Sequence, residues 1–304
     1  MQSERFPIPA FDGAYVHIYN PAGDVYRGKN TAHFTNGTFY NTWIPNDFSV
    51  LHENGTWHMV GITHPKPPQF HAFICENDVH EAEYQLFHCT AKGERFADVF
   101  ASYTFTDKPK LLYPADRPNE RCELWAPHFM KYNGRFQVIY SPQVMRRASS
   151  ADMVTWRQEP PLFTCENGAA RDPYIYTENG VFYCIYTERR QLKYRTSVDL
   201  CRWSDAQILQ EQLFAQAENE SPFLYRKNGI YYLLWSVYDG RNGCYDNRTF
   251  VFAGHTLAEL YNAAPITVLQ AHAPEIVTDT DGTDYLLSVF YPHNGISAVK
   301  LKWV

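Results

Sequence analysis

Long hydrophobic runs are absent from the sequence, and no stretch approaches the roughly 18 apolar residues of a membrane-spanning helix. Runs of basic residues are also absent, and the formal net charge of the chain is −6. Nucleic acids and anionic membrane surfaces are bound through clustered Lys and Arg side chains. The sequence therefore predicts neither a nucleic-acid partner nor a membrane partner.

Paired metal-ligand and cysteine motifs are lacking as well. The seven cysteines are an odd number without C-x-x-C spacing, which favours free thiols in a reducing compartment. The 12 histidines form no H-E-x-x-H motif, so we expect no required cofactor and no catalytic metal. The opening segment, MQSERFPIPAFDGAY, has no basic start followed by an apolar run, as a signal peptide would. We expect a cytoplasmic protein, with a secreted protein whose leader was trimmed as the open alternative.

Aromatic residues, by contrast, are abundant. They make up 16% of the 304 residues, with 22 Tyr, 20 Phe and 7 Trp. Both β-strands and sugar-binding clefts are rich in aromatic side chains. The chain is 45% hydrophobic, which is enough to bury a sizeable core. This composition favours a large all-β domain.

Five segments share one pattern: an extended lead-in, a short apolar strand, an Asn-Gly or Asp-Gly turn, and a second strand. The segments begin at Asn46, Trp125, Arg171, Glu220 and His272, and their turn glycines are Gly55, Gly134, Gly180, Gly229 and Gly282. A repeat of about 50 residues is typical of a four-stranded propeller blade. The sequence predicts one all-β domain over residues 1–304, a five-bladed β-propeller with four-stranded antiparallel blades. A two-sheet sandwich is the alternative.

Further segments fit the same plan. Arg146–Trp156 and Lys193–Trp203 resemble each other and are expected to form the third strand, a turn and the outer strand of blades two and three. The first repeat is longer than the others by about 30 residues. We assign this excess to an insertion at about residues 65–118, a wall or lid at one face. Residues 13–34 are expected to close the ring beside the final segment, SAVKLKWV.

The innermost strand of every propeller blade starts near the central axis, so residues at this start converge. Aligned on the turn glycine, Asp47 and Asp172 share one register, and Glu220 stands one step earlier with a longer side chain. Burying three acids together is costly unless they are paired or functional. Glycoside hydrolysis uses such a set, because one carboxylic acid protonates the leaving oxygen and a second carboxylate activates water or attacks the sugar. A third charge raises the pKa of the acid.

The same region of the blades offers further polar and aromatic side chains. The candidates for sugar binding are Trp43, Asn46, Trp125, His128, Arg171 and His272. Taken singly, each is more often a packing residue than a ligand contact. Arg171 aligns with Glu220 of the next blade, which makes it a candidate to face the site or only a sequence neighbour of Asp172.

These motifs resemble the five-bladed propeller glycosidases, namely glycoside hydrolase family 43 and its relatives in families 32, 62, 68 and 117. The resemblance covers the chain from about Asn46 to its end. Asp47 matches the first-blade Asp of family 43, although Phe48 replaces the usual proline. Asp172-Pro173, Glu220-Ser221-Pro222 and the Trp125–His128 sequence WAPH match the motifs of the other blades.

The resemblance implies a role for each acid: Asp47 as general base, Asp172 as modulator and Glu220 as general acid. It also implies an oligosaccharide or glycoside substrate with a furanosidic or xylosidic bond, of the arabinofuranosidase or xylosidase kind, cleaved with inversion. In this family a fifth-blade histidine often lies near a central ion or water. His272 is placed for that role, which leaves room for a structural calcium at the axis.

Other interpretations stay open. Asn46-Asp47, Arg171-Asp172-Pro173 and Glu220-Ser221-Pro222 also resemble family 32, which implies a retaining β-fructofuranosidase with Asp47 as nucleophile. The WAPH motif and the absence of a C-terminal β-sandwich favour family 43. A carbohydrate-binding propeller without catalysis would be expected to lack one of the acids. A protein-interaction propeller of the WD or kelch type would not need them.

Overall fold

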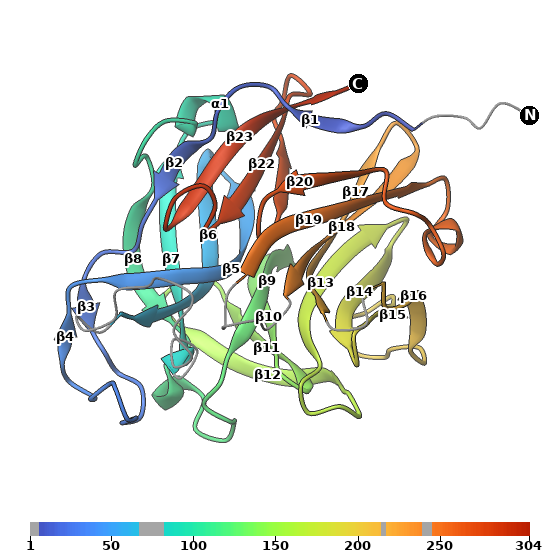
Figure 1. Ribbon diagram of the computed structural model, residues 1–304. Helices are drawn as coiled ribbons and strands as arrows, with labels where there is room; N and C mark the ends of the chain where they lie inside the picture. Colours follow the sequence, from blue (N-terminus) through green and yellow to red (C-terminus); the bar gives the residue numbers. More distant parts are fainter. Residues whose placement is uncertain (1–5, 67–81, 214–216, 239–244) are drawn as a thin grey trace, which may run out of the picture.

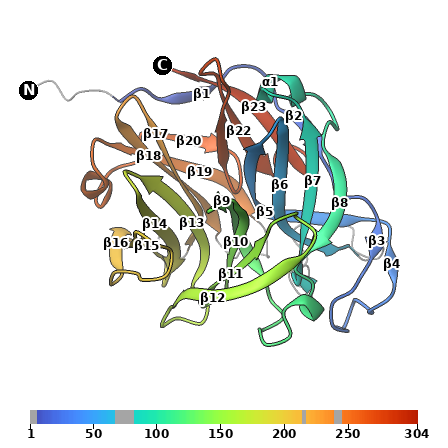
Figure 2. The same ribbon diagram turned by 180° about the vertical axis from the view of Figure 1, so that it is seen from behind.

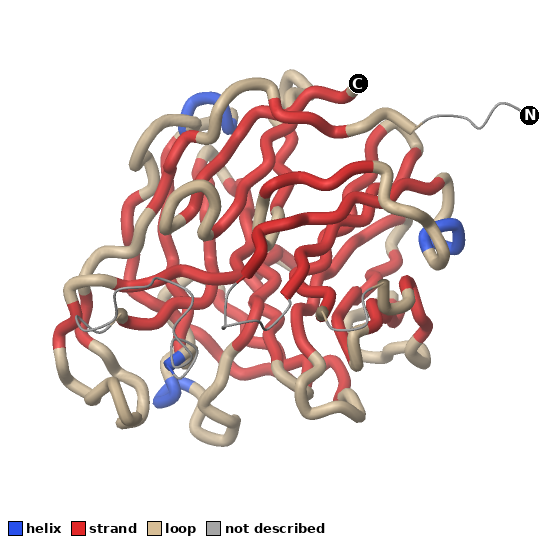
Figure 3. The backbone as a smooth tube through the Cα atoms, in the orientation of Figure 1, coloured by secondary structure: helices blue, strands red, loops and turns tan. Residues whose placement is uncertain are grey.

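The computed structural model describes residues 6–66, 82–213, 217–238 and 245–304. Strands dominate the described chain, and the helical segments, such as α1 (Phe96–Val99), are short (Figure 3). Within these ranges no helix has the length and apolar character needed to cross a bilayer. The five cysteines in the described part of the chain are not joined in disulfides.

Five antiparallel sheets form the blades of a propeller (Figures 1 and 2). Blade one consists of β5 (Trp43–Glu53), β6 (Thr56–Pro65), β7 (Gln85–Lys92) and β8 (Thr106–Leu111), and blade two of β9 (Trp125–Tyr132), β10 (Arg135–Ser141), β11 (Val144–Ser150) and β12 (Trp156–Thr164). Blade three consists of β13 (Arg171–Glu178), β14 (Val181–Glu188), β15 (Gln191–Ser197) and β16 (Gln207–Gln210), and blade four of β17 (Glu218–Lys227), β18 (Ile230–Tyr238), β19 (Tyr245–Gly254) and β20 (Thr267–Gln270). The predicted five-bladed propeller is confirmed.

The fifth blade closes the ring with both ends of the chain. It consists of β21 (Glu275–Thr278), β22 (Asp284–Val289) and β23 (Ile296–Trp303), and both β1 (Pro9–Phe11) and β2 (Val16–Tyr19) pair with β23. Pro9 pairs with Trp303, and Val16 pairs with Ala298. The predicted closure beside the final segment is therefore confirmed. The short strands β3 (Asp24–Val25) and β4 (Phe39–Tyr40) form a separate small ribbon between β2 and blade one.

Four of the predicted hairpins turn on Asn-Gly pairs in which both residues have positive φ. These pairs are Asn54-Gly55, Asn133-Gly134, Asn179-Gly180 and Asn228-Gly229. Positive φ at both central positions defines the type I′ turn, whose twist matches that of antiparallel strands. The fifth hairpin has a longer loop, in which the Asp279 amide donates to the Thr283 carbonyl at 2.7 Å. This longer loop explains why the spacing of the fifth repeat differs.

A second turn recurs between the third and outer strands of blades two and three. Asp152 Oδ1 accepts hydrogen bonds from the amides of Val154 and Thr155, at 2.9 and 2.8 Å. Asp199 Oδ1 accepts them from the amides of Cys201 and Arg202, both at 2.8 Å. Such Asx turns are stable local structures. The structure confirms the third strand and the turn in both predicted segments, whereas the outer strands lie later, beginning at Trp156 in blade two and at Gln207 in blade three.

The predicted insertion at about residues 65–118 needs correction. Strands β7 and β8 lie inside this range, and they are the third and fourth strands of blade one. The extra length of the first repeat therefore lies before β7 and after β8. Residues 67–81 fall outside the described part of the chain. Residues 82–84 lead into β7, and residues 112–124 follow β8. Both segments pack against blade one.

Apolar clusters fill the spaces between neighbouring blades. The cluster between blades five and one, for example, contains Ile18, Phe87 and Leu287, all fully buried. Burial of each such side chain contributes about 1.5–3 kcal/mol to folding. The inner strands of neighbouring blades touch one another around the ring, β5 with β9, β9 with β13, β13 with β17, and β21 with β5. This arrangement brings the starts of the inner strands together at the axis.

Candidate active site

The inner strands of blades one to four are irregular close to their starts. The ladder register shifts between Pro45 and Phe48 in β5, between Arg171 and Tyr174 in β13, and between Glu220 and Phe223 in β17. The residues with positive φ at the aligned position are Ala126 (32°), Asp172 (60°), Ser221 (51°) and Ala273 (47°). Such β-bulges re-aim side chains and are common beside active sites. Blade one differs, because Asp47 does not have positive φ and Phe48 follows it in place of a proline.

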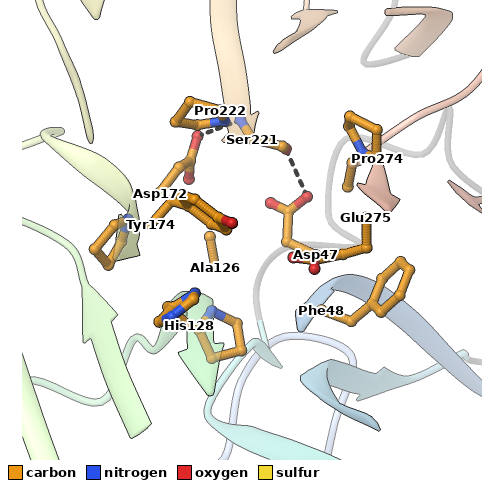
Figure 4. A pocket seen from close by; sticks show the side chains of 13 residues that line it. Asp47, Phe48, Ala126, His128, Asp172, Tyr174, Ser221, Pro222, Pro274 and Glu275 are labelled. Carbon is orange, nitrogen blue, oxygen red and sulfur yellow. Dashed lines mark hydrogen bonds between the residues drawn. The ribbon is translucent and has the colours of Figure 1, made fainter. Parts of the chain in front are cut away.

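Ser221 joins two of the predicted acids. Its hydroxyl donates to Asp47 Oδ1 at 2.7 Å, and its amide donates to Asp172 Oδ2 at 3.1 Å. Figure 4 shows Ser221 between the two carboxyl groups. Asp172 is 4% exposed, and the Asp47 side chain is 16% exposed. Carboxyl groups from blades one and three therefore meet through one residue of blade four.

Arg171 connects the third acid to this pair. Its guanidinium donates to Glu220 Oε1 from Nε at 3.2 Å and from Nη2 at 2.6 Å. Nη2 also donates to Glu218 Oε2 at 2.6 Å, and Nε lies 3.6 Å from Asp172 Oδ2. The open question about Arg171 is answered, because its side chain faces the site.

These groups open into one concave space, which we call the axial cup. Its volume is about 290 Å³. Its lining residues are Asn46, Asp47, Ile62, Glu83, Trp125, Ala169, Arg171, Asp172, Glu218, Glu220 and Tyr238. The structure thus brings the three predicted acids together with Asn46, Trp125 and Arg171. The volume lies at the lower end of the range of ligand pockets, about 300–1,000 Å³.

Four polar residues of this region were not found in the sequence. Glu83 is 3% exposed and accepts a hydrogen bond from Asn46 Nδ2 at 3.3 Å. Glu218 holds Arg171, Tyr238 lines the cup, and Ser221 joins the aspartates. Glu218 stands two residues before Glu220, and alternate residues of a strand share a face. The two-residue spacing from Glu220 could therefore have identified Glu218 in the sequence. Glu83 could not be found in this way, because it lies outside the repeated hairpins on which the sequence was aligned.

Trp43 does not reach the cup, so its predicted contact with sugar is wrong. It is fully buried in a cluster with Tyr26, Phe34 and Tyr84. Its Nε1 donates to the Asp24 carbonyl at 3.3 Å. The register shift between Pro45 and Phe48 interrupts the strand alternation between Trp43 and Asp47, so the sequence spacing misplaced this side chain.

His128 lies deeper along the axis, in what we call the axial chamber. This small cavity of about 30 Å³ is lined by His128, Tyr174 and Glu275, and shares Asp47 and Asp172 with the cup. Burial lowers the pKa of His128 to about 3, so its imidazole is neutral. The His128 and Tyr174 rings meet edge to face at 4.9 Å. His128 is thus a packing residue of the chamber and not part of the cup lining.

His272 stands behind Asp47. It is fully buried, its ring stacks on Phe290 at 5.7 Å, and its Nε2 lies 4.0 Å from Asp47 Oδ1. It does not line the cup, so the predicted direct contact with sugar is not supported by its position. Among the described residues, no three His, Cys, Asp or Glu side chains converge as metal ligands. The structural calcium for which the sequence leaves room at the axis stays a prediction, and we derive no step from it.

The three acids affect one another electrostatically. Burial raises the pKa of Glu220 to about 7, with Arg171 lowering it and Asp172 raising it. Burial raises the pKa of Asp47 well above its usual range, and the charges of Asp172 and Glu220 raise it further. Burial also raises the pKa of Asp172, while Arg171 lowers it. Interacting carboxyl groups titrate as a set, so the three acids together hold their protons to higher pH than isolated acids would.

A sequence profile described as glycosyl hydrolases family 43 matches residues 101–253. No curated protein sequence matches the chain. The structure of a thermostable family-43 glycoside hydrolase is 15% identical, with 87% of this chain and 90% of that chain covered and a TM-score of 0.60.

Two further solved structures share the fold. A β-xylosidase/α-arabinofuranosidase of family 43 from a compost microbial metagenome, in complex with xylotriose, is 13% identical. It covers 86% of this chain and 91% of its own, with a TM-score of 0.59. A family 32 β-fructofuranosidase from Bombyx mori is 17% identical and covers 86% of this chain and 59% of its own, with a TM-score of 0.57. At such identities the likeness concerns the fold.

Proposed function

The chain belongs to glycosyl hydrolases family 43 and is a glycosidase, and from this premise we propose that it hydrolyses a furanosidic or xylosidic bond of an oligosaccharide. The observation that supports the proposal is the meeting of Asp47, Asp172 and Glu220, from three different blades, at one cup of about 290 Å³. Two structural neighbours, the thermostable family-43 hydrolase and the β-xylosidase/α-arabinofuranosidase, belong to the same family. The two activities of the second neighbour, on xylosides and arabinofuranosides, make these the first substrates to test.

Glu220 serves as the general acid. A general acid must hold its proton near the working pH, and burial raises the pKa of Glu220 to about 7. In the reaction the carboxyl proton moves to the glycosidic oxygen as the bond to the anomeric carbon breaks. Asp172 contributes a second negative charge that raises the pKa of Glu220.

Asp47 serves as the general base. It takes a proton from a water molecule, and the water oxygen attacks the anomeric carbon from the face opposite the leaving group. The product then has the inverted anomeric configuration. The hydrogen bond from Ser221 to Asp47 favours the ionised form that a base requires.

The position of Arg171 sets a condition on this mechanism. Its ion pair with Glu220 stabilises the ionised form of the acid, whereas burial and the neighbouring acids favour a proton on Asp47 by raising its pKa. Catalysis needs the opposite distribution, with the proton on Glu220. We infer that the sugar entering the cup draws Arg171 away from Glu220 towards Glu218, whose carboxylate already accepts from Nη2 at 2.6 Å.

One observation favours a second candidate. Arg171 faces the cup, as the Arg of an R-D-P motif would in the family 32 interpretation, and a family 32 β-fructofuranosidase shares the fold. In that case Asp47 attacks the anomeric carbon itself, and the configuration is retained. Membership of family 43 makes inversion the first proposal.

A panel of aryl furanosides and pyranosides tests the substrate class, and proton NMR of the first product anomer distinguishes inversion from retention. Glu220→Gln should reduce kcat on an oligosaccharide by about a hundredfold or more while the melting temperature stays within a few degrees, because a sugar leaving group needs the proton that the acid supplies. Glu166→Gln is the matched control, because its side chain is 84% exposed. Near-normal turnover in Glu220→Gln would refute Glu220 as the acid, and a retained anomer would replace the inverting mechanism.

A further inference from the structure

We propose that a pocket at the edge of blade two is a second carbohydrate subsite, which binds sugar units that extend beyond the unit held in the axial cup. This inference rests on the proposed function, since it concerns the same substrate. We call this cavity the blade-two pocket. It is bounded by residues 119–121, 142–144 and 158–161, together with Arg146.

The blade-two pocket adjoins the axial cup on two sides. Gln143 lines the pocket, and its amide donates to the Ala170 carbonyl at 2.8 Å, while the adjacent Ala169 and Arg171 line the cup. On the other side, the Arg121 guanidinium stands over the Trp125 ring, 5.9 Å from its centroid. Arg121 lines the pocket and Trp125 lines the cup. A ligand that leaves the cup past Trp125 therefore meets the blade-two pocket next.

The pocket is large enough for more than a water cluster. Its volume is about 370 Å³, against about 290 Å³ for the cup. Both values are close to the lower end of the range for ligand pockets, about 300–1,000 Å³. If the cup accommodates one sugar unit, the blade-two pocket accommodates at least one more of similar size.

The lining suits a neutral sugar. Gln143 and Gln158 present side-chain amides, which both donate and accept hydrogen bonds as sugar hydroxyls do. Two guanidinium groups, of Arg121 and Arg146, stand beside two carboxylates, Glu120 among them. The formal charges balance, so the pocket has no excess charge that would select an anion or a cation.

The floor of the pocket is held in place before any ligand binds. Glu120 accepts hydrogen bonds from the Tyr140 hydroxyl at 2.8 and 3.0 Å and from Gln158 Nε2 at 3.0 Å. Arg146, which is 5% exposed, lies 3.5 Å from Glu120 and donates to the Ser141 carbonyl at 2.7 Å. Preorganised polar groups bind with a smaller ordering cost than mobile ones.

The test compares substrates of different length. The variants are Gln143→Gly, in which glycine suits the positive φ of 61°, and Gln158→Ala. We expect each to lower kcat/KM for xylotriose or arabinotriose by roughly tenfold, the effect of one or two lost hydrogen bonds, and to leave an aryl monoglycoside unchanged. Gln191→Ala is the matched control, because Gln191 bonds to Glu211 on blade three. It should change neither rate.

Calorimetry gives a readout that does not depend on turnover. In the Glu220→Gln background, xylotriose and arabinotriose are titrated into the protein with and without the added double variant Gln143→Gly and Gln158→Ala. A loss of affinity of at least about tenfold supports the proposal. Equal affinities, or equal losses of kcat/KM on the monoglycoside and the trisaccharide, overturn it. Failure of the proposed function would appear separately, as absence of hydrolysis of every aryl glycoside by the unmodified protein.

Discussion

The Arg171 guanidinium forms ion pairs with both Glu220 and Glu218. The charge state of Glu220 therefore depends on Arg171, which takes no direct part in the proposed reaction. Arg171 favours the ionised form of Glu220, and Asp172 and Glu218 disfavour it. Burial disfavours it most. The proton affinity of Glu220 is thus a balance of several large effects.

This balance leads to a prediction for Glu218→Gln. The substitution removes a negative charge near Glu220 and leaves Arg171 more fully on Glu220, and both changes stabilise the ionised carboxylate. The folded-state pKa of Glu220, raised to about 7, should fall, and the basic limb of the kcat/KM profile should move to lower pH by roughly one unit. The measurement is the pH profile on an aryl glycoside, with Glu166→Gln as the exposed control. A shift to higher pH would contradict the assignment of Arg171.

At the residue scale, the sequence located the three acids correctly but not all of the residues around them. Asp47, Asp172 and Glu220 were found because the repeat has a fixed phase relative to its turn glycines. Trp43 was misplaced because a bulge interrupts the alternation between it and Asp47. Glu83 was missed because it reaches the cup from a segment outside the repeat, which has no turn glycine on which it could be aligned.

At the scale of elements, the hairpin fixes the spacing between the turn glycine and the start of the inner strand. An Asn-Gly pair selects a type I′ turn, and a two-residue turn fixes the register of both strands. The start of the inner strand then lies at a constant distance from the turn in blades one to four, except for the shift at the bulge. Positive φ at Ala126, Asp172, Ser221 and Ala273 was not predictable, because none of these residue types requires it.

A glycine of one such turn gives the second prediction. Gly180 has φ of +76° with open space around it, so Gly180→Ala creates no clash but places a Cβ in the left-handed region. The free energy of unfolding should fall by about 1 kcal/mol, measured from the urea midpoint. Gly168→Ala is the control, because Gly168 also has open space and does not have positive φ. Equal losses in the two variants would rule out backbone strain as the cause.

In blade one, the length of the repeat alone was not enough to locate the strands. Its long repeat indicated extra chain, and the sequence assigned that excess to about residues 65–118 as one block. In the structure β7 and β8 occupy the middle of the block as ordinary blade strands. Their sequences lack an Asn-Gly turn between them, and α1 (Phe96–Val99) stands in the connection instead. A search based on one kind of turn could not recognise them.

At the scale of the whole molecule, the ring depends on a seam where the two ends of the chain meet. Strands β1 and β2 pair with β23, and Ile18 of β2 is fully buried in the cluster between blades five and one. The other blades each close within one continuous segment of chain. The fifth blade is therefore completed only by residues from the opposite end of the sequence.

The seam gives the third prediction. Ile18→Ala should lower the free energy of unfolding by about 2–5 kcal/mol, because it opens a cavity between two blades. Ile208→Ala on β16 is the matched control, because Ile208 is 37% exposed and should cost well under about 1 kcal/mol. Chemical denaturation measures both. Similar losses in the two variants would show that the seam is no more stabilising than the rim of a blade.

The same pairing bears on how the protein is made. Pro9 is synthesised well before its pairing partner Trp303, which lies 294 residues later in the chain (303 − 9). At roughly 5–20 residues per second, the first strand waits about fifteen seconds to a minute for the sheet that receives it. During synthesis, the strands of blades one to four become available in order, while β1 and β2 lack their partner strand β23 until it has been made. Strands β1 and β2 thus join their sheet only after the other four blades have been synthesised.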